Sequence, residues 1–96
     1  MKVEACGKPQ GAKLIRVSAE IEVRDDTPVV MSISFRGDFF ALPEEGFEEA
    51  EASLRSVPLA GLAETFDRAM RLRGVRLLGI SGRDVEEILG KAFHET

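Results

Sequence analysis

The chain has 96 residues, of which 44% are hydrophobic and 31% are charged, and its formal net charge at pH 7 is −4. Residues 1–96 suit one domain with a small core, and the composition excludes a disordered or membrane-embedded chain. The acidic balance disfavours nucleic-acid binding, which depends on clustered cations. Glu4 and Lys8 lie where a secretory signal would be apolar, so we expect a cytoplasmic protein that binds neither nucleic acid nor a membrane.

Three segments of the N-terminal half alternate between apolar and polar residues, which is the period of a half-buried strand. The segment from Lys2 to Cys6 predicts a short edge strand, and the one from Leu14 to Arg24 is the clearest of the three. The third begins at Val29, and the short Asp25–Pro28 connection before it predicts an antiparallel hairpin. The core-facing residues predicted for the two long strands are Ile15, Val17, Ala19, Ile21, Val23, Val29, Met31, Ile33 and Phe35.

A loop over residues 7–13 separates the first two strands and carries two lysines. Gly11 and a proline give this loop the chemistry of a sharp turn. Lys8 and Lys13, together with exposed backbone N–H groups, can meet a phosphate or an adenylate. The alternative is that both lysines are solvated loop residues.

Gly37 and two phenylalanines follow the third strand. An isolated glycine at the end of a strand pattern indicates a bulge or a close backbone approach. Phe39 and Phe40 are adjacent, so they point in opposite directions if the chain stays extended. One of these rings can therefore enter the core, and the other must find cover elsewhere.

The C-terminal half predicts helices, because its apolar residues recur at helical spacing. The first begins near Pro43 and ends near Arg55, and the second runs from about Leu59 to Arg73, where Gly74 ends it. Ser81 is expected to cap the third by accepting a hydrogen bond from the N–H of Asp84. Residues 75–80 form a short, mostly apolar run that fits either a strand or a connector. The buried stripes are expected to contain Phe47, Ala50, Leu54, Leu59, Leu62, Ala63, Phe66, Ala69, Met70, Val85, Ile88, Leu89, Ala92 and Phe93.

These elements predict a two-layer α+β domain, in which an antiparallel sheet of about three strands carries three helices on one face. Arginines without an acid between them occupy residues 68–83, and they fit either solvated helix ends or a docking patch for an acidic partner.

The residues offer little catalytic chemistry. His94 is the only histidine and lies near the C-terminus, which is a poor place to hold a base. Cys6 is the only cysteine, so the chain has neither an internal disulfide nor a zinc site of several thiolates. We expect Cys6 to be a small, buried or half-buried apolar group, and a reactive thiol is the alternative. The residues alone favour a non-catalytic binding or accessory module with no metal site.

Four segments sharpen this interpretation: residues 8–14, 37–40, 43–45 and 79–81, which read KPQGAKL, GDFF, PEE and GIS. With these segments, about residues 8–93 resemble the small accessory domain of lipoate–protein ligases. That domain is the C-terminal domain of single-chain enzymes and a separate small subunit of bipartite ones. Similar proteins commonly have Pro-Gly-Gly-Lys in the loop, whereas here the proline comes one position earlier and Ala12 replaces the second glycine.

The resemblance implies a heterodimer with a catalytic subunit, in which ATP, magnesium and lipoate are used to form lipoyl-AMP. The lipoyl group then passes to a lysine of an acceptor domain. Small family members are needed for the adenylation but have no active site and bind no cofactor of their own. The resemblance places Lys8, Gly11 and Lys13 towards the nucleotide site of the partner. It assigns the docking surface to Gly37, Asp38, Phe39 and Phe40.

Two other functions remain open from the sequence. The sheet-and-helix layout resembles that of sulfur or iron–sulfur carriers and scaffolds, which depend on cysteines. A generic protein-interaction module is the third possibility.

Overall fold

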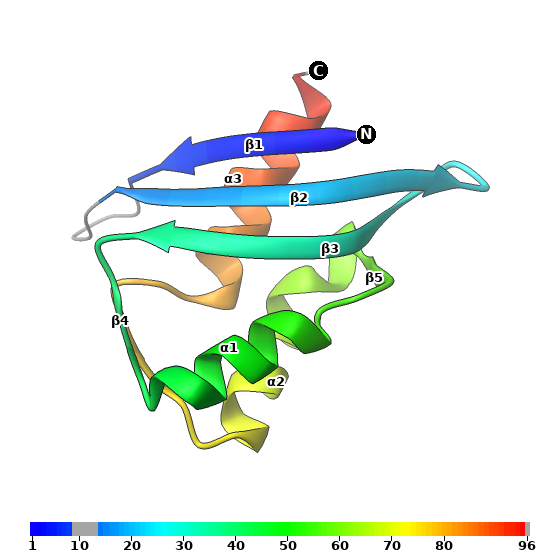
Figure 1. Ribbon diagram of the computed structural model, residues 1–96. Helices are drawn as coiled ribbons and strands as arrows, with labels where there is room; N and C mark the ends of the chain where they lie inside the picture. Colours follow the sequence, from blue (N-terminus) through cyan, green and yellow to red (C-terminus); the bar gives the residue numbers. More distant parts are fainter. Residues whose placement is uncertain (9–13, 96) are drawn as a thin grey trace.

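In the part of the chain that the structure describes, residues 1–8 and 14–95, four strands form one antiparallel sheet and three α-helices pack on one of its faces (Figure 1). This computed structural model confirms the two-layer α+β fold. The strands lie in the order β1-β2-β3-β5, and β4 pairs with β6 in a separate ribbon. Along the chain the elements are β1 (Lys2–Gly7), β2 (Ile15–Arg24), β3 (Thr27–Gly37), β4 (Phe40–Leu42), α1 (Glu44–Ser53), β5 (Val57–Pro58), the 3-10 turn η1 (Leu59–Gly61), α2 (Leu62–Leu72), β6 (Arg76–Leu78) and α3 (Gly82–His94).

Strands β2 and β3 form the predicted hairpin. Arg24 and Thr27 are opposite each other, and Asp25 and Asp26 make the turn between them. The φ angles of these aspartates are 51° and 65°, in the left-handed region. Two-residue turns of this kind match the twist of the flanking strands, which explains why the hairpin closes so tightly.

A bulge interrupts the pairing of β2 with β3. Glu20 is opposite Ser32, but the next residue, Ile21, is opposite Val30, so Met31 is an extra residue in β3. Because one residue is added, the alternation of faces shifts along the first part of β3. As a result the side chain of Val30 is fully buried.

This shift contradicts part of the predicted core. Ile33 and Phe35 are buried as expected, whereas Val29 and Met31 are only half-buried. The prediction for Val29 and Met31 is wrong because the alternation was extended through the bulge. The prediction for Val23 is also wrong, since 58% of this residue is exposed near the end of the hairpin.

The core lies between the sheet and the helices, and its centre is aromatic. Phe66 of α2 is fully buried, and its ring centroid is 5.3 Å from that of Phe35 on β3. Phe47 of α1 is 6.1 Å from the same Phe35 ring, edge to face. The helical residues buried as predicted are Phe47, Ala50, Leu54, Leu59, Leu62, Phe66, Ala69, Met70, Val85 and Leu89.

The helices begin and end close to their predicted bounds. The second helical segment starts with the 3-10 turn η1 before α2, and Gly74 follows α2 with a φ of 62°. Ser81 caps α3, because its Oγ accepts a hydrogen bond of 3.2 Å from the N–H of Asp84. None of the described helices is long and apolar enough to cross a bilayer.

Helices α2 and α3 cap each other. The N–H of Gly82 donates to the Asp67 carboxylate on α2 at 3.0 Å, and the N–H of Ala63 donates to the Glu86 carboxylate on α3 at 2.9 Å. Each helix therefore satisfies one of the free N–H groups at the start of the other. Gly82 allows this close crossing, since a Cβ there would overlap the carbonyl oxygen of Ala63.

Short strands add to the sheet of about three strands that the sequence predicts. β5 pairs with β3 through Val57 and Val30, where only a break between helices was expected. Beyond β5, the carboxylate of Glu51 on α1 accepts a hydrogen bond of 2.9 Å from the N–H of Phe35. This contact satisfies a backbone group at the edge of β3 that would otherwise stay unpaired.

Candidate functional site

Lys8 and Gly37, two of the residues singled out in the sequence, lie at the same end of the sheet. Ile15 begins β2 and is paired with Gly7 on one side and with Gly37 on the other. Lys8 follows Gly7, so it lies at the same end of the sheet as Gly37, two strands away, and its side chain is exposed. Gly11 and Lys13 lie outside the described residues.

Gly37 makes the close backbone approach that its position predicted. Its φ is 140°, and a Cβ on this residue would overlap the carbonyl oxygen of Leu14. The same carbonyl accepts a hydrogen bond of 3.1 Å from the N–H of Asp38. The chain can therefore leave β3 and turn into β4 only with glycine at this position.

The two phenylalanines point in opposite directions, as predicted. Phe39 is half-buried, and its ring centroid is 5.4 Å from that of Phe47 on α1. Phe40 is 72% exposed. Phe39 thus belongs to the fold, and Phe40 is available to another molecule.

Phe40 belongs to an apolar surface formed by β4 and β6. Phe40 is directly opposite Leu78, and Leu42 is opposite Arg76. Leu42 is 61% exposed and Leu78 is 71% exposed, whereas Ala41 between the two β4 side chains packs against the core. We call Phe40, Leu42 and Leu78 the ribbon face.

Some arginines of residues 68–83 are solvated residues on helices, and another is placed for contact with an acidic partner. Arg68 and Arg83 form ion pairs of 3.4 Å with Glu64 and 3.2 Å with Glu87 on their own helices. Arg73 donates to the Ala69 carbonyl at the end of α2, as cations near a helix C-terminus do. Arg76, which is exposed beside the ribbon face, is the member placed to meet an acidic partner.

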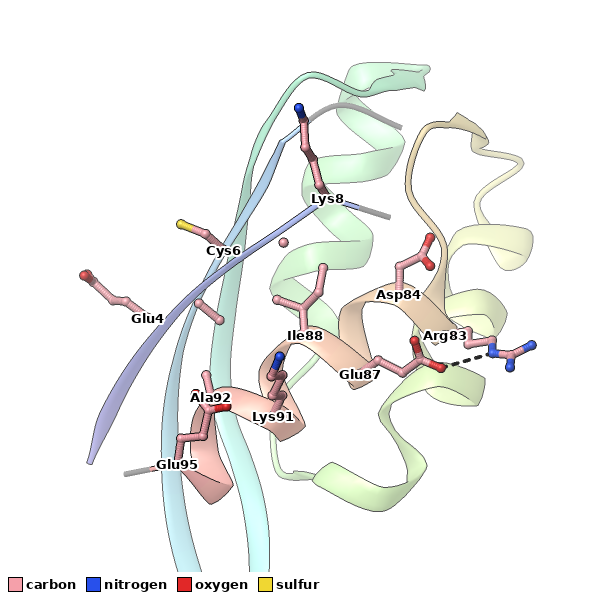
Figure 2. Close-up of a pocket in the computed structure, with 12 residues that line it drawn as sticks. Glu4, Cys6, Lys8, Arg83, Asp84, Glu87, Ile88, Lys91, Ala92 and Glu95 are labelled. Atoms are coloured by element: carbon pink, nitrogen blue, oxygen red, sulfur yellow. Dashed lines mark hydrogen bonds and ion pairs between the residues drawn. The ribbon is translucent and has the colours of Figure 1, made fainter. Parts of the chain in front are cut away.

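A wide hollow of about 890 Å³ lies between β1 and α3. Ile88 forms its apolar floor, and Glu87 and Lys91 bring charges of both signs to its rim (Figure 2). The side chains of Glu4 and Cys6 point away from α3 in this view. The hollow therefore has mixed charge and no nucleophile directed into it.

Cys6 is exposed, so the prediction that it is buried or half-buried is wrong. Val3 and Ala5 take the inward positions of β1, and Cys6 follows Ala5 on the outward side. The alternation of the strand thus decides the environment of the thiol. Cys6 lies directly across from Arg16 on β2.

The described residues contain no buried polar or charged side chain and no group of three or more His, Cys, Asp or Glu that could hold a metal ion. His94 is exposed at the end of α3, where its ring contacts Phe93. Acid–base catalysis requires a base held against a reacting group. His94, which is exposed at the end of α3, is not enclosed in such a site.

The comparisons with known proteins agree with this fold. One solved structure is similar over 93% of this chain and 94% of its own, with a TM-score of 0.70 and 24% sequence identity. It is described as an archaeal lipoylation system, a bipartite lipoate protein ligase and its E2 lipoyl domain from Thermoplasma acidophilum. No family model matches the chain, and no curated protein matches it. The likeness establishes the fold.

The ribbon face is a surface that sequence reasoning did not assemble. Phe40 was singled out, but Leu42 and Leu78 were not. Both β4 and β6 are three residues long, which is too short for alternation to become visible. The apolar residues 40–42 and 77–78 were the available signal.

Proposed function

We propose that this chain is the non-catalytic accessory subunit of a bipartite lipoate–protein ligase. It acts with a catalytic subunit in the ATP-dependent conversion of lipoate to lipoyl-AMP, ahead of protein lipoylation. ATP, magnesium and lipoate belong to the complex, and lipoyl acceptor domains are reached through the catalytic subunit.

The observation that carries this proposal is the likeness to a chain of a bipartite ligase system along almost the whole length of both chains. The two chains overlay over 93% and 94% of their residues, so the likeness extends along nearly all of both. Fold alone does not establish an activity.

The ribbon face gives the accessory subunit a place to dock. Its three large apolar side chains are more than half exposed, and such side chains grouped together mark interaction sites. Lys8 and Gly37 lie at the end of the sheet from which the chain enters β4, so Lys8 and the ribbon face can contact one partner together.

The decisive experiment reconstitutes the reaction. A catalytic lipoate ligase subunit without its accessory domain is mixed with this protein, ATP, magnesium and lipoate, and lipoyl-AMP is measured. We expect a complex on size exclusion and more lipoyl-AMP than the catalytic subunit forms alone. If no complex forms and lipoyl-AMP does not increase, the proposal is wrong.

Lys13→Ala separates docking from chemistry. If Lys13 faces the nucleotide site, the variant should still form the complex but should produce lipoyl-AMP about tenfold more slowly, the effect of one lost charge-assisted contact. Lys91→Ala, at an exposed position on α3, is the matched control. Unchanged activity of the Lys13 variant would show that this residue has no part in the mechanism. Lys8→Ala tests Lys8 by the same measurement.

A different variant distinguishes the accessory-subunit function from that of a sulfur carrier. Cys6 is exposed, so its thiol is accessible to a carrier's reaction partner, and the effect of removing the thiol is the test. An accessory subunit with Cys6→Ser should support the same lipoyl-AMP formation as the unchanged chain, whereas a sulfur carrier would lose its function.

A further inference from the structure

Two arginines are paired directly opposite each other on the open face of the sheet. Arg16 of β2 and Arg36 of β3 are partners in the register, and both are exposed on the side that the helices do not cover. Opposite residues of an antiparallel pair have Cβ atoms about 5 Å apart, and like charges at that spacing destabilise the pair. The fold therefore holds an unfavourable arrangement at this point.

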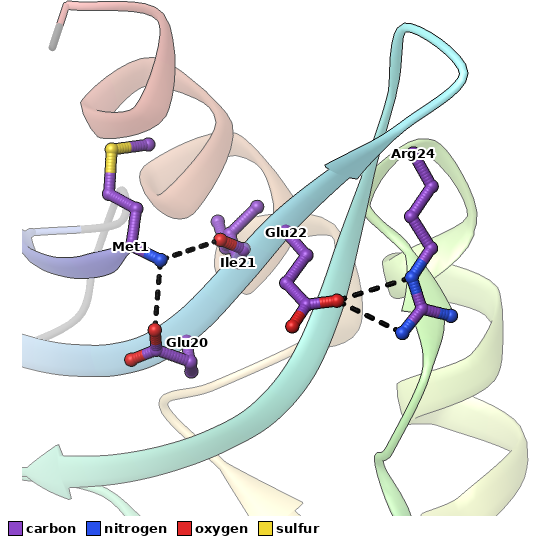
Figure 3. A network of polar contacts seen from close by, with 5 residues as sticks. All are labelled: Met1, Glu20, Ile21, Glu22 and Arg24. Carbon is purple, nitrogen blue, oxygen red and sulfur yellow. Dashed lines mark hydrogen bonds and ion pairs between the residues drawn. The ribbon is translucent and has the colours of Figure 1, made fainter.

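Other charges on the same face are neutralised by neighbours. The N-terminal ammonium is 2.8 Å from the Glu20 carboxylate, and Arg24 is 2.9 Å from that of Glu22 (Figure 3). Lys2 is 3.6 Å from the carboxylate of Glu4. Within residues 1–8 and 14–95, by contrast, neither arginine of the pair has an acidic partner.

The surroundings of the pair supply hydrogen-bond donors to an anion. A hollow of about 460 Å³ on the open face is lined by Arg16 and Arg36, and also by Ser18 and Ser34, whose side chains carry hydroxyl groups. These serines are themselves register partners, so they form the next rung of the same two strands. Glu4 is the one acid among the residues that line the hollow, and Lys2 already neutralises it.

We propose that Arg16 and Arg36 bind the phosphate groups of a small anionic ligand. Each guanidinium presents a planar fork of N–H donors that matches the oxygens of a phosphate, and two forks from adjacent strands can hold one phosphate or a diphosphate between them. The anion removes the repulsion between the arginines. This binding concerns the chain alone and holds whether or not the chain serves a ligase.

The test is a titration of the whole chain with inorganic pyrophosphate, ATP and AMP, followed by NMR of the backbone amides and the arginine Nε–H groups. Sodium chloride is added to the reference sample to equal ionic strength. We expect signals of Arg16, Arg36 and the two serines to move with pyrophosphate and not with chloride. Equal movement with chloride would overturn the proposal.

The three ligands distinguish the source of the phosphate. Similar binding of pyrophosphate and ATP supports a site that recognises phosphate alone. Binding of ATP or AMP without pyrophosphate supports a nucleotide ligand. If none of the three moves the arginine signals, the proposal is wrong.

Variants complete the test. Arg16→Gln and Arg36→Gln should each weaken binding about tenfold, as expected for one lost charge-assisted contact to an anion. Arg55→Gln is the matched control, because Arg55 is an exposed arginine in the connection between α1 and β5. Equal weakening by the control would show screening by overall charge and would contradict a site.

Thermal unfolding gives a second measurement that does not depend on NMR. In chloride buffer the Arg36→Gln protein should melt at a higher temperature than the unchanged chain, because the repulsion is gone. Pyrophosphate should then raise the melting temperature of the unchanged chain more than that of the variant, which binds it about tenfold more weakly. A variant that melts lower in chloride would show that Arg36 stabilises the fold, and the premise of the proposal would fail.

Discussion

At the scale of single residues, Gly37 connects the sheet to the ribbon face. Its φ of 140° lies in a region that residues with a Cβ rarely adopt, and the carbonyl oxygen of Leu14 occupies the space of that Cβ. Strain and overlap therefore act at the same position. A larger residue there must move β2 away from β3 or change the direction of β4.

Gly37→Ala should lower the free energy of unfolding by about 2 kcal/mol or more, since backbone strain and steric overlap both oppose the native conformation. Urea denaturation measures this change. Gly90→Ala is the control, because Gly90 lies inside α3 with open space where a Cβ would be. That variant should gain about 1 kcal/mol of stability from helix propensity. Equal effects of the two variants would show that the contact with Leu14 is unimportant.

The sequence predicted the environment of some residues and missed that of others for a physical reason. Phe39 and Phe40 were predicted to diverge, because adjacent side chains of an extended chain must point to opposite sides. Cys6 was wrongly expected to be buried or half-buried, because it was treated as a small apolar group. Since Ala5 already faces inward, the strand turns Cys6 outward whatever its hydrophobicity.

At the scale of elements, the contact between α2 and α3 depends on exchanged caps. Asp67 of α2 accepts from the first residue of α3, and Glu86 of α3 accepts from Ala63 near the start of α2. Both carboxylates are half-buried and lie at the positive ends of helix dipoles. Each helix therefore fixes the position at which the other begins.

Asp67→Ala and Glu86→Ala should each lower the free energy of unfolding by about 1 kcal/mol, the usual cost of losing a side-chain cap. Glu87→Ala is the matched control on α3, since its ion pair with Arg83 is exposed and is worth less than about 0.5 kcal/mol. Chemical denaturation of the three variants decides the comparison. If Glu87→Ala is as costly as Glu86→Ala, the exchanged caps do not contribute.

Long elements could be predicted from the sequence, and short or irregular ones could not. Residues 14–24 alternate over enough positions for the period of a strand to be visible, and the three helices show their stripes. The bulge at Met31 cannot be seen in the sequence. Val29, Val30 and Met31 are all apolar, so the alternation of apolar and polar residues does not show which of them face the core. β4, β5 and β6 have three residues or fewer and depend on partners distant in the sequence.

At the scale of the whole molecule, the chain has two separate surfaces. The ribbon face is apolar and carries Arg76 beside it, and the open face of the sheet carries Arg16 and Arg36. Both are formed by residues that the core does not need. The fold can therefore support a large change on either surface without losing stability, which makes function and folding separable in experiments.

Phe40→Ser should leave the free energy of unfolding within about 0.5 kcal/mol of the unchanged chain, as exposed positions do. It should weaken binding to the catalytic subunit at least tenfold, or about 1.4 kcal/mol, if the ring is a central contact. Val23→Ser is the control, because Val23 is also exposed and apolar but lies at the hairpin end of the sheet. Isothermal titration calorimetry measures the affinity. Equal weakening by both variants would exclude the ribbon face as the docking surface.

Cys6 also has a practical use. It is the chain's one thiol, it is exposed, and it sits one strand away from Arg16. A nitroxide attached to this sulfur would broaden the NMR signals of any molecule that settles on the open face of the sheet, and the label itself would lie outside the aromatic core. The sequence thus already contains a single labelling position beside the surface whose ligand is sought, with no engineered cysteine required.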